Sequence, residues 1–181
     1  MSGFYLHTER LSLREMTRED FPALCNTLQD IEVMYAWEHA FSEEEVSAWI
    51  ERNLARYAEF GYGHWLVLDR ATGECVGQAG LLPEEIEGEQ QLGIGWILCR
   101  KHWGKGYAVE AARACVDHAF ATLHAPQLIA DIRPENTASI RVAEKLGMSA
   151  GGVFDKIYRN KVMPHRLYTL KNPLTRPDTQ Q

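Results

Sequence analysis

The stretch from residue 94 to residue 111 constrains this chain most, because it joins a strand, a glycine loop and a helix without a break. Apolar residues fill Ile94 to Cys99, and a helical pattern begins directly after Gly104-Lys105-Gly106. A helix N-terminus presents unpaired N–H groups and about half a positive charge, and glycine lets the backbone approach an anion closely. We predict a phosphate-binding site here, with Lys101 and Lys105 adding positive charge. The alternative is a turn whose glycines only terminate the flanking elements.

Two better-known phosphate loops do not match this stretch. The Walker pattern requires Ser or Thr after its lysine, whereas Lys105 is followed by Gly106. The dinucleotide pattern G-x-G-x-x-G fails because Gly93-Ile94-Gly95 has Leu98 at the position of the third glycine. Neither ATP hydrolysis nor NAD binding is supported.

Composition narrows the classes of partner. The length of 181 residues suits one domain, and 19 Lys+Arg against 25 Asp+Glu give a net charge of −6. An acidic chain has no general attraction to nucleic acid or anionic lipid, and no apolar run approaches the ~20 residues that a bilayer requires. The four cysteines and seven histidines show no metal-ligand spacing, and the first residues carry no signal-peptide pattern. We expect a cytoplasmic protein without nucleic acid, membrane or metal.

Hydrophobic periodicity and turn signals give the expected elements. The first helix begins at Thr17 or at Asp20 with Pro22 in its first turn, the S-x-x-E capping box at Ser42 starts the second, and Gly147 ends the fourth. Residues 34–39 are expected to form a loop or irregular turn, and Pro83 to Glu89 an acidic loop. Strands are expected at residues 10–15, 64–69, 74–82, 90–98, 127–132, 151–158 and 163–170, and helices after residue 17 or 20 and at about 42–60, 106–122 and 136–146.

The resulting order is β-α-α-β-β-β-α-β-α-β-β in a single domain, with no repeats or linkers. Three consecutive hairpin strands favour an antiparallel arrangement, whereas the later helices connect strands that can run parallel. We therefore expect an α+β fold around one mixed sheet of about seven strands.

Four motifs in order resemble one known superfamily. The segment Lys101-His102-Trp103-Gly104-Lys105-Gly106 resembles the Q/R-x-x-G-x-G/A loop of the GNAT acetyltransferases, with Lys at the first position. Its companions resemble the ribosomal-protein-alanine N-acetyltransferase (RimJ/RimL-like) branch of that superfamily. They are Thr8-Glu-Arg-Leu-Ser-Leu-Arg14 with Asp20, Trp103-Gly-Lys-Gly-Tyr-Ala108 with Glu110-Ala111, and Pro134-Glu-Asn136-Thr-Ala-Ser139 with Glu144-Lys-Leu-Gly147.

The resemblance covers residues 8–170 and implies an N-acetyltransferase (GNAT) domain there, with residues 171–181 as a mobile tail. It implies acetyl-CoA as cofactor, with CoA as product, in a splayed V between the fourth and fifth strands. Pantetheine would pair with the backbone of the strand before the loop, and pyrophosphate would lie on the loop and the helix N-terminus. The implied cofactor-binding residues are Trp96, Ile97, Leu98, Cys99, Lys101, His102, Trp103, Gly104, Lys105, Gly106, Tyr107, Ala108, Asn136 and Ser139.

The implied reaction is direct attack of an amine on the thioester, with a strand N–H near Leu98 stabilising the oxyanion. Many GNAT enzymes protonate the departing thiolate with a Tyr, but Ala143 stands at that position here. In the matching branch the Ser equivalent to Ser139 takes this role, so Ser139 is the catalytic candidate. Asn136 can instead be a helix N-cap with Ser139 a first-turn residue, and Tyr158 and Tyr168 are possible substitutes as the thiolate's proton donor.

The acceptor is a protein N-terminus or a small-molecule amine, and the protein is expected to be a monomer or homodimer. At pH 7, deprotonation costs roughly 1 kcal/mol for an α-amine but about 4.6 kcal/mol for a lysine. Trp37, Glu38 and Tyr158 are the expected substrate-lining residues, while Glu38 and His39 are candidate bases or solvated loop residues. The alternative function is a GNAT-fold module that binds acyl-CoA without turnover.

Overall fold

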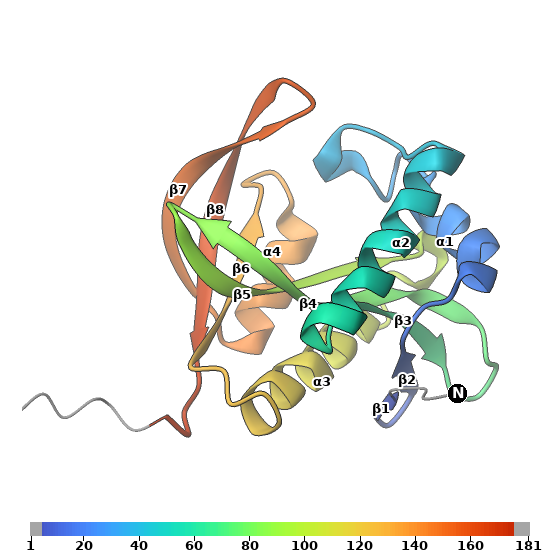
Figure 1. Ribbon diagram of the computed structural model, residues 1–181, viewed down its shortest axis with the longest axis horizontal. Helices are drawn as coiled ribbons and strands as arrows, with labels where there is room; N and C mark the ends of the chain where they lie inside the picture. The colour runs from blue at the N-terminus through green and yellow to red at the C-terminus, as the bar shows by residue number, and fades with distance from the viewer. Residues whose placement is uncertain (1–4, 176–181) are drawn as a thin grey trace, which may run out of the picture. The chain divides into compact units, whose positions relative to one another are not determined.

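The structure is a computed structural model that describes residues 5–175 (Figure 1). Within this range it contains eight strands and four α-helices, together with three short 3-10 helices. The strands are β1 (Tyr5–His7), β2 (Leu11–Arg14), β3 (His64–Asp69), β4 (Cys75–Ile86), β5 (Glu89–Leu98), β6 (Gln127–Ile132), β7 (Ser149–Tyr158) and β8 (Lys161–Lys171). The helices are η1 (Arg18–Asp20), α1 (Phe21–Leu28), η2 (Tyr35–Trp37), α2 (Glu43–Phe60), η3 (Arg100–His102), α3 (Tyr107–Ala121) and α4 (Thr137–Leu146).

The helix termini follow the sequence signals. Ser42 is the N-cap of α2, its hydroxyl accepting from the Glu45 N–H at 3.2 Å while the Glu45 carboxylate accepts from the Ser42 N–H at 2.8 Å. Gly61 ends α2 and Gly147 ends α4, each in the left-handed region that glycine adopts without steric cost. These predictions are confirmed.

Both expected starts of the first helix occur in succession. Thr17 opens the 3-10 turn η1 with a capping box completed by Asp20. Asp20 is then the N-cap residue of α1, and Pro22 lies in its first turn, where a missing N–H costs nothing. The expected irregular segment at 34–39 contains the 3-10 turn η2.

The strand predictions hold except around the acidic segment and at the N-terminus. Pro83 to Ile86 belong to β4 and β5 starts at Glu89, so the expected loop at 83–89 is wrong for most of its length. Only Glu87 and Gly88 are needed for the turn, because both have positive φ, the geometry of a two-residue hairpin turn. Strand β1 was not predicted, and it brings the total to eight.

The strands form one mixed sheet in the order β1-β2-β3-β4-β5-β6-β8-β7 (Figure 1). Neighbouring ladders are antiparallel at β1–β2, β2–β3, β3–β4, β6–β8 and β7–β8. The parallel pairing of β5 with β6 is recorded at Gly93↔Ile129. The α+β fold with a mixed sheet is confirmed, whereas a splayed V between β5 and β6 stays a prediction.

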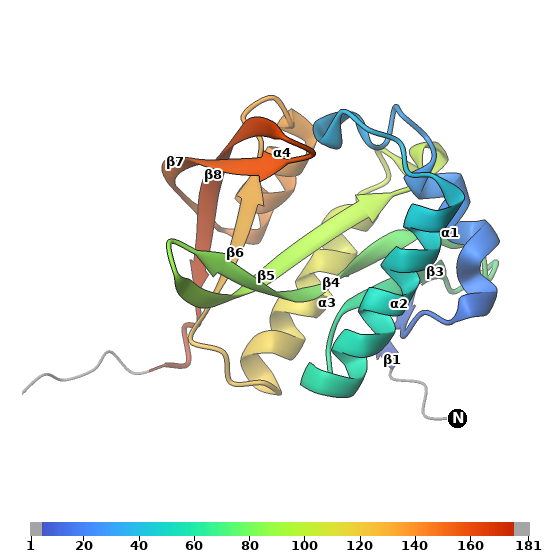
Figure 2. The same ribbon diagram turned by 45° about the horizontal axis from the view of Figure 1, so that its top comes forward.

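The chain divides into two compact units, one of residues up to 82 with 94–115, the other of residues 83–93 with 116 onward. In the first unit, α1 and α2 pack on the sheet (Figure 2). The apolar core between them is made of Met16, Leu24, Leu28, Val33, Met34, Val46, Ile50, Leu66 and Ile97.

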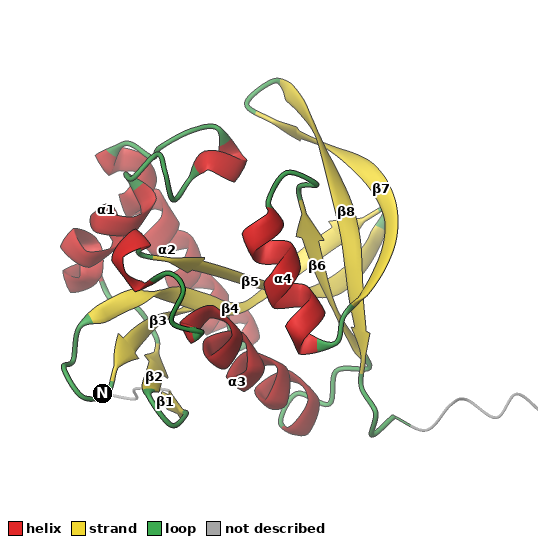
Figure 3. Cartoon of the chain, turned by 180° about the vertical axis from the view of Figure 1, so that it is seen from behind, coloured by secondary structure: helices red, strands yellow, loops and turns green. Residues whose placement is uncertain are grey.

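The second unit is built around the β6–β8–β7 ladder, with α4 beside β6 (Figure 3). Arg159 and Asn160 form the β7–β8 turn with positive φ, as a tight hairpin requires. Asn172, the second residue of the expected tail, is buried and donates from Nδ2 to the Ala125 carbonyl at 2.9 Å. A mobile tail stays a prediction, and residues 176–181 lie outside the described range. Among residues 5–175 no helix has the length and apolarity to cross a bilayer.

Candidate active site

The glycine loop after β5 lies in the first unit and leads directly into α3. Gly104 and Gly106 have φ of 75° and 79°, so both adopt the left-handed conformation that a side chain makes costly. A Cβ on Gly104 would meet nothing within 4 Å. The Glu110 N–H donates to the Gly106 carbonyl at 3.1 Å, which makes this the first hydrogen bond of α3. The preceding N–H groups therefore remain free of helical partners at the positive end of the helix dipole.

Lys101 and His102 of η3 face the side chain of Glu74, the residue directly before β4. Lys101 forms an ion pair with Glu74, and His102 Nε2 lies 3.5 Å from Glu74 Oε2. The hydrogen bond from Lys101 lowers the pKa of Glu74, while burial lowers the pKa of His102. Because Glu74 offsets this positive charge, an anion at the loop would depend mainly on the backbone N–H groups there.

A brace from the N-terminal segment holds the loop and α3 together. The Glu110 carboxylate accepts from Thr8 Oγ1 at 2.6 Å, from the Arg10 N–H at 2.8 Å and from Arg10 Nε at 2.7 Å. Arg10 Nη1 also donates to the Lys105 carbonyl at 2.9 Å. Burial raises the pKa of Glu110, but these hydrogen bonds outweigh it, so the pKa is lowered. The Thr8-x-Arg10 motif thus holds the backbone of the glycine loop at Lys105.

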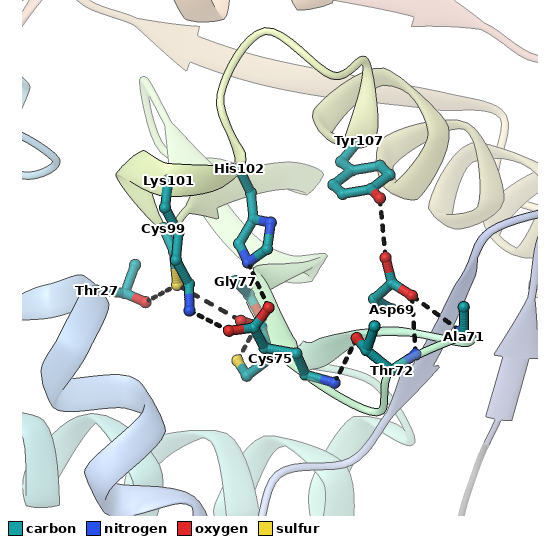
Figure 4. Close-up of polar contacts among 11 residues, drawn as sticks. Thr27, Asp69, Ala71, Thr72, Cys75, Gly77, Cys99, Lys101, His102 and Tyr107 are labelled. Atoms are coloured by element: carbon teal, nitrogen blue, oxygen red, sulfur yellow. Dashed lines mark hydrogen bonds and ion pairs between the residues drawn. The ribbon is translucent and has the colours of Figure 1, made fainter.

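Two aromatic residues are anchored as well: Trp103 in the loop and Tyr107, the first residue of α3. Tyr107 donates from its hydroxyl to Asp69 Oδ2 at 2.9 Å (Figure 4), and the Arg10 guanidinium lies 4.6 Å from its ring centroid. Trp103 donates from Nε1 to the Leu98 carbonyl at 3.0 Å, yet 46% of its surface is exposed. The exposed part of the Trp103 ring, held in place by this hydrogen bond, offers a ligand an apolar surface.

The strand residues before the loop are mostly buried. Ile97, Leu98 and Cys99 are each less than a tenth exposed, so their contribution to a ligand would come from the backbone. Cys99 Sγ lies 2.9 Å from the Thr27 hydroxyl of α1 (Figure 4). A Cβ on Gly77 of β4 would lie 2.4 Å from the Ile97 carbonyl, so glycine is required there for β4 and β5 to approach.

In the second unit, Asn136 and Ser139 occupy the start of α4. Asn136 is the N-cap, and its Oδ1 accepts from the backbone N–H of Ser139 at 3.1 Å. The cap uses the amide of Ser139 and not its hydroxyl. Ala143, at the position of the missing Tyr, is fully buried.

The expected substrate-lining residues fall in different parts of the fold. Trp37 is the last residue of η2 and packs against the core of the first unit. Glu38 follows it with a φ of 54°, a strained value for a residue with a side chain. Tyr158 is the last residue of β7, in the second unit, opposite Lys161 in the hairpin.

Sequence reasoning missed the residues that support the loop from a distance: Thr8, Arg10, Asp69, Glu74 and Glu110. Thr8, Arg10 and Glu110 stood in the quoted motifs, but local patterns do not reveal contacts about a hundred residues apart. The available signal was their presence in the quoted motifs, one at residues 8–14 and one that contains the loop.

Comparison with known proteins identifies the family to which this chain belongs. The family model described as "Acetyltransferase (GNAT) domain" matches residues 10–149. The chain belongs to the GNAT acetyltransferase family. It is 37% identical over 168 residues to the uncharacterized protein YkkB of Bacillus subtilis, covering 92% of this chain and 95% of that protein. It is 33% identical to the uncharacterized N-acetyltransferase YnaD of the same organism, covering 84% and 86% of the two chains.

Solved structures agree with the family. A GNAT acetyltransferase from Bacillus anthracis matches with a TM-score of 0.80 and 29% identity, covering 93% of this chain and 99% of that one. RimL, a ribosomal-protein α-N-acetyltransferase solved in complex with coenzyme A, matches with a TM-score of 0.76, 19% identity, and coverage of 93% and 98%. That likeness concerns the fold alone. The protein is an acyl-CoA-dependent N-acetyltransferase of the GNAT family.

GNAT acetyltransferases use acetyl-CoA, and the loop residues fit such a ligand. Gly104 and Gly106 keep Cβ atoms away from the N-terminus of α3, and Trp103, Gly104 and Lys105 are exposed. No group of three or more His, Cys, Asp or Glu side chains positioned to hold a metal ion is found within residues 5–175.

Proposed function

We propose that this GNAT enzyme transfers the acetyl group of acetyl-CoA to a primary amine, either a protein N-terminus or a small-molecule amine. The observation that carries the proposal is the loop at Gly104 and Gly106, where two left-handed glycines open α3 toward an anion. A C–N bond forms between the amine and the acetyl group, and the thioester C–S bond breaks. The amine loses one proton and the departing CoA thiolate gains one, which gives free CoA thiol.

The phosphate groups would be held by backbone N–H groups of Lys101, His102, Trp103, Gly104, Lys105, Gly106, Tyr107 and Ala108. The backbone of Trp96, Ile97, Leu98 and Cys99 would pair with pantetheine, since amides at a strand edge need partners. Asn136 and Ser139 complete the proposed set. When bound, acetyl-CoA supplies an activated thioester carbonyl.

The Ser139 hydroxyl is the group that we propose to protonate the CoA thiolate. Its support is that the N-cap bond uses the Ser139 amide, so the helix does not require the hydroxyl as a cap. The RimJ/RimL-like branch is the proposed subgroup, supported by the Thr8-to-Arg14 motif and its brace on Glu110.

A continuous thiol-release assay tests the function. Acetyl-CoA is supplied with peptides that have free N-termini, polyamines and aminoglycosides, and we expect amine-dependent release of CoA thiol with at least one class. Saturable acetyl-CoA binding without amine-dependent release in any class would favour the alternative, an acyl-CoA-binding module without turnover.

Substitution of Ser139 by Ala tests its role. We expect kcat to fall by about 100-fold, the lower end of general-acid contributions, with the Kd for acetyl-CoA unchanged. The matched control is Ser47→Ala on α2, which removes an exposed hydroxyl that donates to the Glu43 carbonyl at 3.0 Å. Unchanged kcat in Ser139→Ala would remove this residue from the catalytic role.

A further inference from the structure

A buried polar cluster in the first unit is not used by the phosphate loop. It consists of Trp49 on α2, His64 on β3 and Gln78 on β4. Trp49 Nε1 donates to Gln78 Oε1 at 2.8 Å, and the Trp49 and His64 ring centroids lie 5.0 Å apart. His64 is 4% exposed and Gln78 is 0% exposed, whereas Trp49 is only partly buried. Buried polar groups of this kind are normally hydrogen-bonded.

Two atoms of this cluster lack any hydrogen-bond partner among the described residues: Gln78 Nε2 and His64 Nδ1. The bond from Trp49 occupies Gln78 Oε1, which fixes the amide so that its NH₂ group is the unpaired end. The cluster therefore contains an amide NH₂ group that needs an oxygen acceptor and an imidazole nitrogen that needs a partner of its own. Unpaired buried groups are costly unless a ligand completes them.

The imidazole of His64 reaches the strand that precedes the phosphate loop. His64 pairs with Gly80 on β4, and a Cβ on Gly95 of β5 would lie 2.9 Å from His64 Nε2. Glycine at position 95 thus leaves space for the ring, whereas a Cβ on Gly80 would meet backbone, the Gly63 carbonyl oxygen at 2.0 Å. Gly95 directly precedes Trp96, the first residue proposed to pair with pantetheine. The cluster thus lies beside the strand that would carry the thioester.

The surroundings of His64 disfavour positive charge. Its backbone is held by Asn53 and Tyr57 of α2, which are neutral, and the nearby charges are those of Arg52 and Arg56 on the same helix. Burial, with the two arginines adding to it, lowers the pKa of His64 to about 3, so the ring is neutral near pH 7. An ammonium group would be repelled here, and a neutral amine would not.

We propose that this polar cluster receives the acceptor amine, with His64 as a positioning residue, and that the acceptor is an α-amine next to a carbonyl oxygen. The inference rests on the proposed function. The carbonyl oxygen accepts from Gln78 Nε2, and the neutral amine bonds the imidazole of His64. At pH 7 about one α-amine in ten is uncharged, against about one lysine-type amine in 2,500. Polycationic amines are therefore poor acceptors.

The first test compares acceptors and two variants. Kinetics are measured with an alanine-peptide amide, spermidine and an aminoglycoside, and we expect the peptide amide to have the highest kcat/KM. His64→Gln removes the imidazole, and Gly95→Ala places a methyl group against its Nε2. Both should raise the amine KM by about three- to tenfold, the value of one hydrogen bond, with the Kd for acetyl-CoA within twofold of wild type.

Matched controls use residues away from the proposed sites. His118→Gln replaces another buried histidine, and Gly152→Ala adds a methyl group where nothing lies within 4 Å. Both should keep wild-type kinetics. Thermal midpoints are recorded for all variants. If His64→Gln does not fold, the amine KM of Gly95→Ala is compared with that of the wild type instead.

A spectroscopic readout completes the test. With CoA present, ¹⁵N resonances of the His64 imidazole should shift when the peptide amide is added and not when spermidine is added. A higher kcat/KM for polycations, or an amine KM unchanged in both variants, would overturn this inference and leave the proposed function standing. Acetyl-CoA binding without acetylation of any amine would overturn the proposed function and the inference with it.

Discussion

At the residue scale, the site depends on positions where a side chain is absent. Gly106 has a φ of 79° and lies directly before α3, so a side chain there would strain the backbone and cover the proposed anion position. We expect Gly106→Val to abolish saturable acetyl-CoA binding in calorimetry. Gly61→Val is the control, because Gly61 has a similar left-handed φ of 75° at the end of α2, and a Cβ there would meet nothing within 4 Å. If both variants lost acetyl-CoA binding equally, backbone strain alone would explain the loss in Gly106→Val.

His64 gives a residue-scale prediction on stability. Its pKa is lowered from 6.5 to about 3 by burial, so the unfolded chain binds the extra proton more readily than the folded one below pH 6.5. The stability that neutral His64 contributes is therefore complete above pH 6.5 and declines as the pH falls toward 3. Between pH 7 and pH 5 the wild type should lose about 2 kcal/mol more unfolding free energy than His64→Gln. Urea denaturation at the two pH values measures the difference, and parallel losses would contradict the prediction.

At the element scale, the brace on Glu110 links the β1–β2 turn to α3. We expect Glu110→Gln to lower the unfolding free energy by about 1–2 kcal/mol, since charged hydrogen bonds contribute more than neutral ones but Arg10 is partly exposed. The acetyl-CoA Kd should rise too, because Arg10 also holds the Lys105 carbonyl. Because the pKa of Glu110 is lowered, its contribution is present above pH ~4.3 and is lost on further acidification.

The matched control for this brace is the surface ion pair of Arg18 with Glu51. Both side chains are more than half exposed, so Glu51→Gln should leave the unfolding free energy and the acetyl-CoA Kd unchanged. Denaturant titration and calorimetry measure both quantities. An effect of Glu51→Gln equal to that of Glu110→Gln would show that the brace has no special role.

The elements also show what the sequence could predict. Strands β3 and β6 and the capping box of α2 follow from local periodicity and local hydrogen bonds, and all three occur as predicted. Strand β1 has three residues and is defined by backbone pairing with β2, so no side-chain pattern announces it. Pro83 and the acidic residues Glu84 and Glu85 are typical of a loop, yet they lie within strand β4. The glycine loop was predictable, whereas the contacts of Glu74 and Glu110 arise only from folding.

At the scale of the whole molecule, a net charge of −6 opposes an anionic ligand. The positive charge of Lys101 and His102 does not simply offset this net negative charge, because both side chains lie against the carboxylate of Glu74. The structure therefore supports recognition by the N-terminus of α3 and the loop backbone, which carry partial charge without ionisable side chains. In this way the proposed site would let an acidic chain accommodate a pyrophosphate.

Binding at that site must also stabilise the whole fold, because a ligand that binds only the folded state shifts the unfolding equilibrium by mass action. At a free acetyl-CoA concentration of 100 times Kd the gain is about 2.7 kcal/mol, which for a chain of this size raises Tm by about 5–11 °C. Differential scanning calorimetry over a series of acetyl-CoA concentrations measures the rise, with adenosine as the control that lacks pyrophosphate and pantetheine. Adenosine should cause little change. A Tm independent of acetyl-CoA up to millimolar concentration would contradict both the assignment of the loop and the fit of its glycines to a phosphate.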